Sequence, residues 1–351
     1  MTRRTAARSI VALVLAVASG WTAAPALAGW QLSGTTFTSI LYNQGIAYDR
    51  ARGNVFFDGV TSTTNSGLYR TNAQLSLTGA NFGVLPATTE GFNHTGDLTF
   101  DPLRRRILLP LECYYPARGG NTCGVGAIGV ADPVTLRFLY YVDLAPSQIA
   151  KAMWAEIDPS GRWIWTSSGT HLLVYRVADV NPSVAARQRA GATGGIVGQD
   201  LGPVLPASGV TGAAFVSEPF THARELLLAL NLGTSFEVIS YDVTGEPGPP
   251  ALVSTTPQRL ITVPQSFLNN EPEGLAATRV FDVSDPLGGV LHWQLLPKIT
   301  LLSLFSRILN YVRSDPAGAQ LSVTASPPRR RRIEGPALGR AAQRAIVAAL
   351  R

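Results

Sequence analysis

Five polar side chains of this chain could carry out chemistry together, although they lie far apart in the sequence. They are Gln44, His94, Asp97, Glu156 and Glu273. Calcium prefers carboxylate and amide oxygens, because it takes about six to eight oxygen ligands in a flexible geometry. A histidine beside such an ion could act as general base on a water molecule that the metal polarises. We therefore predict a calcium site formed by the three carboxylates and the amide, with His94 as the catalytic residue.

An ordinary structural role is the alternative for each of these side chains. Polar residues often begin strands or cap turns, where hydrogen bonds satisfy them. The position of Glu273 also differs from that of the other two carboxylates. Counted from the opening of the repeat described below, Asp97 and Glu156 have the same strand parity, whereas Glu273 has the opposite parity. We therefore expect Glu273 to join the site only from the loop before its strand.

The expectation that these side chains meet depends on a phrase that recurs along the chain. Its clearest copy is residues 153–168, MWAEIDPSGRWIWTSS, in which an apolar run and an Asp precede a Pro-Ser-Gly turn and an alternating aromatic run. This pattern predicts two antiparallel strands joined by a tight turn. Copies of the phrase open at Gly45, Asp97, Trp154, Gly212 and Gly274.

A repeat of roughly 50 to 60 residues has room for one four-stranded sheet and its loops. We therefore predict an all-β protein, a β-propeller with five or six four-stranded blades. A sixth blade could lie within residues 181–209 or in the closing segment, and no segment between residues 29 and 297 shows a helical periodicity. A propeller must close its ring, so we expect a strand from residues 30–41 to join the last repeat at residues 289–296. Loops that lead into the innermost strands crowd around the central channel, which would bring the five polar side chains together.

The two ends of the chain differ from the repeats. Residues 1–28 begin with three arginines, continue with an apolar stretch and end in Ala-Leu-Ala, the pattern of a secretory signal with cleavage after Ala28. Residues 301–312 read LLSLFSRILNYV, which predicts a terminal helix that is too short to span a bilayer. The predicted divisions are a signal peptide at 1–28, a propeller at 29–300, a helix and linker at 301–325, and a basic, disordered tail at 326–351.

Composition and charge indicate a folded, exported protein rather than one that binds nucleic acid. Hydrophobic residues make up 46% of the chain and charged residues only 15%, which suits a packed core. The formal net charge of +6 comes from arginines in the two terminal segments, so the predicted propeller itself has no basic face for DNA or RNA. We expect a secreted or periplasmic monomer without a membrane span, whose partner is a small molecule or an extracellular ligand.

The chain has two cysteines, Cys113 and Cys123, in the Gly-rich segment LECYYPARGGNTCG. In an exported protein this spacing predicts one disulfide that closes a loop. Zinc binding is the weaker alternative, because no third cysteine and no histidine stands at the spacing of a zinc site.

Several phrases resemble those of secreted bacterial β-propeller proteins of unknown function, over about residues 44–297. They are GIAYD, NHTGDLTFD, LLPLECYYP, KAMWAEIDPSG and EPEGLA. More distantly, GIAYD and PEGLA are similar to phrases of the esterase-like phytase and gluconolactonase-type propellers. Gluconolactonase-type enzymes hold a divalent cation in the central channel through a Glu, and the resemblance implies that Glu273 is the corresponding residue.

Two functions are compatible with these patterns. The first is a calcium-dependent hydrolase that acts on a phosphate ester or a lactone at the mouth of the central channel. The second is a non-catalytic extracellular module that binds a partner through its propeller loops. The sequence lacks the local signatures of serine hydrolases and zinc peptidases, and it does not decide whether the protein is an enzyme.

Overall fold

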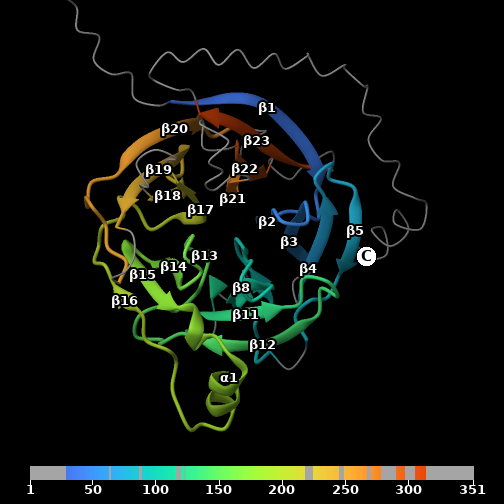
Figure 1. The fold of residues 1–351 in the computed structure, drawn as a ribbon, viewed down its shortest axis with the longest axis vertical. Helices are drawn as coiled ribbons and strands as arrows, with labels where there is room; N and C mark the ends of the chain where they lie inside the picture. The colour runs from blue at the N-terminus through green and yellow to red at the C-terminus, as the bar shows by residue number, and fades with distance from the viewer. Residues whose placement is uncertain are drawn as a thin grey trace, which may run out of the picture.

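Five sheets stand as blades around a central axis, so the fold is the predicted β-propeller, with five blades rather than six (Figure 1). The computed structural model describes residues 29–62, 65–86, 89–115, 120–121, 123–217, 224–244, 249–266, 270–277, 290–296 and 305–313. The predicted signal peptide at 1–28 and the basic tail at 326–351 lie outside the described residues. No helix in the described ranges is long and apolar enough to cross a membrane.

Four blades follow one another along the chain, each with its first strand nearest the axis. The first blade consists of β2 (Gly45–Asp49), β3 (Asn54–Ser62), β4 (Asn65–Asn72) and β5 (Leu77–Asn81). The second consists of β6 (His94–Thr95) and β7 (Thr99–Asp101), which share the innermost position, then β8 (Arg106–Glu112), β11 (Ala127–Ala131) and β12 (Phe138–Asp143). A small hairpin, β9 (Tyr114–Tyr115) and β10 (Gly120–Asn121), lies between β8 and β11 in the sequence. The third blade consists of β13 (Glu156–Ile157), β14 (Trp163–Ser168), β15 (His171–Arg176) and β16 (Gln199–Asp200). The fourth blade consists of β17 (Val210–Ser217), β18 (Arg224–Asn231), β19 (Ser235–Val243) and β20 (Gln258–Pro264).

The fifth blade is assembled from both ends of the described chain. From the axis outward its strands are β21 (Glu271–Ala277), β22 (Val290–Leu296), β23 (Phe305–Arg313) and β1 (Trp30–Ser39). β1 pairs antiparallel with β23, and this pairing closes the ring without leaving the edge of β23 unpaired. The prediction that an N-terminal strand completes the last blade is therefore confirmed, but its partner is β23 rather than residues 289–296.

The helix predicted at residues 301–312 is wrong for the part that the structure describes, because Phe305–Arg313 forms β23. Its side chains are buried on both faces of the sheet. Ile308 packs in the cluster shared with the first blade, whereas Leu309 and Tyr311 pack in the cluster shared with the fourth. A strand that is buried on both faces has a nearly continuous apolar run, which periodicity alone cannot distinguish from a helix. The propeller therefore extends to residue 313 instead of ending at residue 300.

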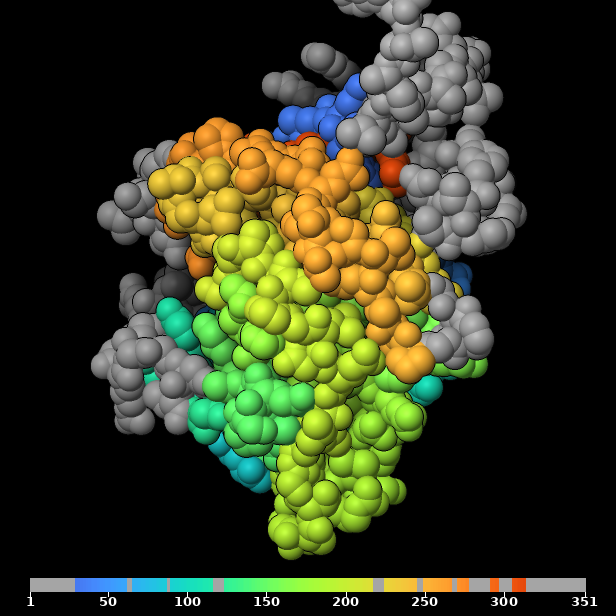
Figure 2. All heavy atoms as spheres, turned by 90° about the vertical axis from the view of Figure 1, so that its left-hand side faces the viewer, coloured from blue at the N-terminus to red at the C-terminus, as the bar shows by residue number. Residues whose placement is uncertain are grey.

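Residues 181–209 do not form a sixth blade. They contain a helix, α1 (Pro182–Arg189), and the outermost strand of the third blade, β16. The expectation that no helix occurs before residue 297 is therefore wrong at α1 and at the short 3-10 helix η2 (Val177–Asp179) that precedes it. The side chain of Asn181 accepts a hydrogen bond from the Val184 N–H at 3.0 Å, which caps the helix. α1 projects from the ring in Figure 1, and Figure 2 shows the same projection from the side as a yellow-green lobe.

The hydrophobic core lies between neighbouring blades. Between the third and fourth blades, Trp154, Trp165 and Phe215 are almost fully buried, and the rings of Trp165 and Phe215 meet edge to face with centroids 5.7 Å apart. Alternate side chains of a strand point to opposite faces, so each blade is packed against both of its neighbours. This packing fixes the innermost strands, which surround the channel.

Candidate functional site

The innermost strands approach one another closely where the repeats open. Gly45, Gly212 and Gly274 stand there, and a Cβ atom added to them would lie 2.6, 2.7 and 2.7 Å from backbone atoms of neighbouring strands. Glycine has no Cβ, so only glycine lets the backbones approach this closely. We call the end of the channel where the innermost strands begin the N-side mouth, and the opposite end the C-side mouth.

Asp97 closes the channel at this level. Its carboxylate accepts hydrogen bonds from the backbone N–H groups of Ile46, Ala213 and Leu275, at 3.1, 3.0 and 3.1 Å. These three residues belong to the first, fourth and fifth blades. Burial raises the pKa of Asp97 well above its usual range, and the three N–H donors act in the opposite direction. Asp97 therefore links three other blades to the second one across the axis and separates the two mouths.

At the N-side mouth, His94 faces Glu112 across the neighbouring strands β6 and β8. The His94 Nδ1 and Glu112 Oε1 atoms are 2.9 Å apart, and both side chains are mostly buried. The ring of Tyr114 lies beside the imidazole, with centroids 5.2 Å apart. The contact lacks the geometry of a hydrogen bond, but a carboxylate at this distance faces the positive charge that forms when the ring takes up a proton. The pair is therefore suited to proton transfer.

Glu273 lies at the same mouth and is only 8% exposed. Within the described parts of the chain, no hydrogen-bond donor or cation pairs with its carboxyl group. Burial raises the pKa of Glu273 well above its usual range. Four nearby carboxyl groups raise this pKa further, those of Glu271, Asp97, Asp58 and Glu112. Carboxylates so close together repel one another unless they bind protons or a cation.

Two acidic residues of the N-side mouth were not predicted from the sequence. Asp58 is fully buried on β3 opposite Gly45, and Glu112 lies on β8 opposite His94. Burial raises the pKa of Asp58 to about 8, while the nearby Thr95 hydroxyl and Gly45 N–H act in the opposite direction. Both residues occupy the second strand of a blade, directly across from the position that the sequence singled out. The antiparallel register, counted outward from each predicted turn, is the signal that could have found them.

The predicted calcium ligands do not all lie at one mouth. Glu273 lies with His94 at the N-side mouth and Asp97 closes the channel, but Glu156 lines the C-side mouth. Glu156 stands two residues beyond the opening of its repeat, and two strand residues span about 7 Å along the axis. Gln44 is half-buried just before β2, where its backbone N–H donates to the Asp58 carbonyl at 3.2 Å. Among the side chains that the structure describes, no three His, Cys, Asp or Glu are grouped as a metal site requires, so calcium binding stays a prediction.

A cavity of about 670 Å³ opens at the C-side mouth, between the ends of the innermost strands. Glu156 projects into it from β13, and its Oε1 accepts the Phe215 N–H at 3.4 Å. Burial raises the pKa of Glu156 to about 7. Bonds from Thr99 and Phe215 and the charge of Arg50 lower it, whereas Asp158 raises it. A carboxyl group with this pKa can exist in both protonation states near neutral pH.

Two arginines line the same cavity. Arg50 follows β2, and its Nη2 donates to the Ala277 carbonyl at 2.6 Å. Burial lowers the pKa of Arg50 to about 10, while the charge of Glu156 acts in the opposite direction. Arg224 begins β18, and its Nη1 lies 3.3 Å from Oδ2 of Asp158. The cavity therefore combines two cationic side chains with a carboxyl group that is partly protonated.

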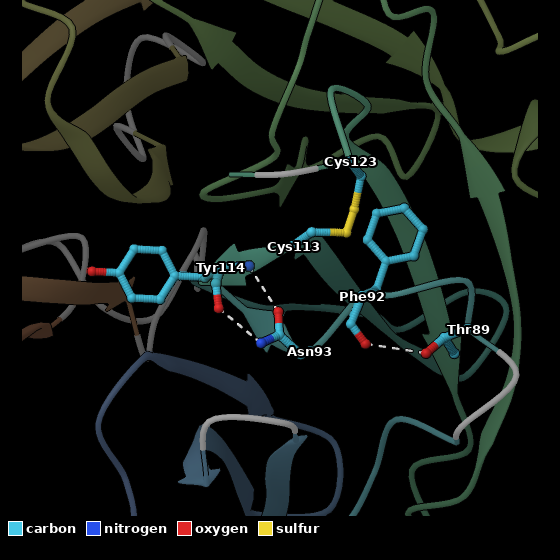
Figure 3. The surroundings of a disulfide bond; sticks show 6 residues. All are labelled: Thr89, Phe92, Asn93, Cys113, Tyr114 and Cys123. Atoms are coloured by element: carbon cyan, nitrogen blue, oxygen red, sulfur yellow. Dashed lines mark hydrogen bonds between the residues drawn. A yellow bond between two sulfur atoms is a disulfide. The ribbon is translucent and has the colours of Figure 1, made fainter. Parts of the chain in front are cut away.

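The predicted disulfide between Cys113 and Cys123 is confirmed, with Cα atoms 5.5 Å apart. It joins the end of β8 to the segment before β11 (Figure 3). Beside it, the Asn93 amide bonds both backbone groups of Tyr114: Nδ2 donates to the carbonyl at 2.8 Å and Oδ1 accepts the N–H at 2.7 Å. These links hold the start of β6 against the chain that follows β8, and so they help to position His94.

No protein-family model and no curated protein matches this chain. Among solved structures it is similar to a GH43 endo-arabinanase from Bacillus licheniformis, with 11% identity and a TM-score of 0.48, over 78% of this chain and 95% of that one. It is also similar to a Bacillus subtilis arabinanase, with 9% identity and a TM-score of 0.47, over 80% and 97% of the two chains. A glucose dehydrogenase aligns with 11% identity and a TM-score of 0.39, over 81% and 98%. At such low identity, the function has to be argued from this chain's own residues.

Proposed function

We propose that the protein is a calcium-dependent hydrolase that acts on a phosphate ester or a lactone at the N-side mouth of the channel. The observation that carries the proposal is the carboxyl group of Glu273, which is buried, lacks a partner among the described residues and lies near four other carboxyl groups. A divalent cation would relieve this repulsion, and calcium accepts oxygen ligands of this kind together with backbone carbonyls and water. An extracellular or periplasmic location is part of the proposal, because a structural disulfide persists in an oxidising compartment.

The catalytic group of this proposal is His94. It would take the proton of the attacking water, while Glu112, 2.9 Å from its Nδ1, faces the charge that forms. Calcium, when bound, would polarise the oxygen of the bond to be cleaved. Glu273 would hold the ion, with Asp58 or Glu271 as the neighbouring donor. Asp97 has a structural part, because both of its oxygens already accept backbone hydrogen bonds.

The charge of the N-side mouth offers a way to distinguish the two substrate classes. A phosphate ester is anionic, so the acidic mouth would repel it unless a cation neutralises the carboxylates. A lactone is uncharged and lacks this repulsion. Calcium should therefore lower the KM of a phosphate ester strongly, whereas for a lactone its main effect should be on kcat.

The test is hydrolysis of p-nitrophenyl phosphate and of gluconolactone by the purified chain, in calcium and in chelator. His94→Gln should lower kcat by about 100-fold or more, as expected for loss of a general base. The matched control is His171→Gln, because His171 also lies 2.9 Å from a carboxylate, that of Asp200, but is 46% exposed on the third blade. Hydrolysis that survives His94→Gln, or that is equal in chelator, would contradict the proposal. If calcium binds but neither substrate is cleaved, the N-side mouth belongs to a non-catalytic binding module instead.

A further inference from the structure

The geometry points to a second ligand site, at the C-side mouth, which binds a small organic carboxylate. The cationic groups of this site are Arg50 and Arg224, and neither has a part in the proposed hydrolysis. The carboxylate of Asp97 and the converging glycines lie between this cavity and the N-side mouth. The inference is therefore independent of the proposed function.

The size of the cavity suits a small molecule. Its volume of about 670 Å³ falls within the range of roughly 300 to 1,000 Å³ that is typical of small-molecule sites. Strands from all five blades contribute to its walls, the fourth through Phe215 of β17 and the start of β18. Because these strands are packed in the blades on which the core depends, the cavity is preformed.

The charges around the cavity favour an anion. The acidic residue nearest Arg224 is Asp158, and its carboxylate is already occupied by the turn in which it lies: it accepts the Ser160 hydroxyl at 2.6 Å and the backbone N–H of Trp163 at 3.1 Å. The other acidic residue at the rim, Asp49, lies 3.2 Å from Nη2 of Arg105. Asp49 is thus paired outside the cavity, and Asp158 binds only Nη1 of Arg224, at 3.3 Å, beside the two donors of its own turn. Arg224 is 22% exposed, so part of its guanidinium is accessible from the cavity.

Glu156 adds a second way to recognise a carboxylate. In its protonated form it is a hydrogen-bond donor and no longer repels an anion. The charged groups that face it are Arg50 after β2, Asp158 on the turn after β13 and Asp97 at the channel axis. Burial raises its pKa to about 7, so protonation occurs as the pH falls through neutrality. Binding of a carboxylate should therefore become tighter from pH 8 to pH 6.

The remaining walls are apolar, which distinguishes an organic carboxylate from a bare inorganic anion. Phe100, Phe215 and Ile157 come from three different blades and all line the cavity. Aromatic side chains stabilise a bound ligand by contact with its apolar part, whereas a small hydrated anion gains nothing from them. The ligand class that fits both walls and charges is a carboxylate with a ring or a short aliphatic body.

The test is calorimetric titration of the full chain with phenylacetate, with its uncharged counterpart phenylacetamide and with inorganic phosphate. Phenylacetate should bind, phenylacetamide should bind at least about tenfold more weakly, and phosphate should bind more weakly than phenylacetate. Arg50→Gln and Arg224→Gln should each weaken phenylacetate by about tenfold, as expected for loss of a charge-assisted hydrogen bond. The matched control is Arg137→Gln, because Arg137 is an exposed arginine in the turn between β11 and β12 and does not line the cavity.

Three results would overturn the inference. The first is that phenylacetate and phenylacetamide bind equally well. The second is that both arginine variants bind phenylacetate as tightly as wild type does. The third is that phenylacetate does not bind at concentrations up to about 10 mM. Thermal melts of each variant show whether it folds, and one folded variant of the two is enough for the comparison. Glu156→Gln supplies an independent readout, since it should remove the change in phenylacetate affinity between pH 6 and pH 8 while the protein still binds the ligand.

Discussion

At the scale of a single residue, Asp97 shows how one buried carboxylate can organise a ring of blades. Its three backbone donors come from three other blades, and the glycines at the repeat openings leave just enough space for it. An added Cβ at Gly212 or Gly274 would lie 2.8 Å from one of its oxygens. The opening position of the repeat is therefore a point of contact between blades as well as the start of a strand.

Asp97→Asn should destabilise the propeller. The asparagine amide turns one N–H group toward the backbone donors, so at least one of them loses its acceptor while buried. We expect the free energy of unfolding to fall by about 3 kcal/mol, which corresponds to a drop in Tm of roughly 5 to 10 °C. The control is Asp132→Asn, because Asp132 accepts the backbone N–H groups of Val134 and Thr135 through one oxygen in a surface turn, and asparagine keeps that oxygen. A Tm of Asp97→Asn that equals that of the control would show that the carboxylate is dispensable.

Asp58 should make stability depend on pH in a direction that is unusual for an aspartate. Burial raises its folded pKa to about 8, whereas an unfolded aspartate has a pKa of about 4. Between these values the folded protein holds a proton that the unfolded chain has lost, so the free energy of unfolding decreases as the pH rises from 4 to 8. The contribution of this one group is at most about 1.4 kcal/mol per pH unit.

The measurement is urea unfolding of wild type and Asp58→Asn at pH 5, 6.5 and 8. The variant should lose less stability over this range than wild type. A residual decrease is expected in the variant, because Glu156 and Glu273 also have raised pKa values and act in the same direction. Parallel pH dependences of the two proteins would show that Asp58 is ionised in the folded state.

At the scale of secondary-structure elements, the sequence predicts the strands and turns that have a local signal. It misses elements whose structure depends on packing against neighbouring blades. The hairpins around the Asp and Gly turns are predicted, because their strand parity and turn residues are local. β23 is missed, because its apolar side chains serve two neighbouring blades and their spacing imitates a helix. α1 is missed although Asn181 and Pro182 are typical residues for a helix start, because its eight residues have little amphipathic pattern.

The same distinction between local and long-range information explains which residues of the candidate site the sequence predicts. His94 and Glu273 are found from the sequence because they precede the openings of two repeats. Asp58 and Glu112 come from second strands, where only the register places them at the mouth. The position of Glu156 could not be predicted without knowing that the channel is closed at Asp97, since strand parity gives the direction of a side chain but not the side of a barrier on which it lies.

At the scale of the whole molecule, the propeller presents two mouths of opposite character on one axis. The N-side mouth gathers carboxyl groups around one histidine, whereas the C-side mouth holds two arginines and an apolar wall. A cation suits the first and an anion the second. Because backbone and the Asp97 carboxylate fill the level between them, occupation of one mouth should have little effect on the other.

Calcium should therefore stabilise the protein through the N-side mouth alone. A ligand that binds only the folded state raises its stability by mass action, by about 4 kcal/mol at a thousandfold excess over Kd, which corresponds to a rise in Tm on the order of 10 °C. Melts in millimolar calcium and in chelator should differ in this way for wild type and for Glu156→Gln, but not for Glu273→Gln. Glu156→Gln is the matched control, because Glu156 is a half-buried channel carboxyl group on the other side of Asp97. Superimposable melts of wild type would exclude the calcium site, and a calcium effect that is lost in Glu156→Gln but kept in Glu273→Gln would place the ion at the C-side mouth.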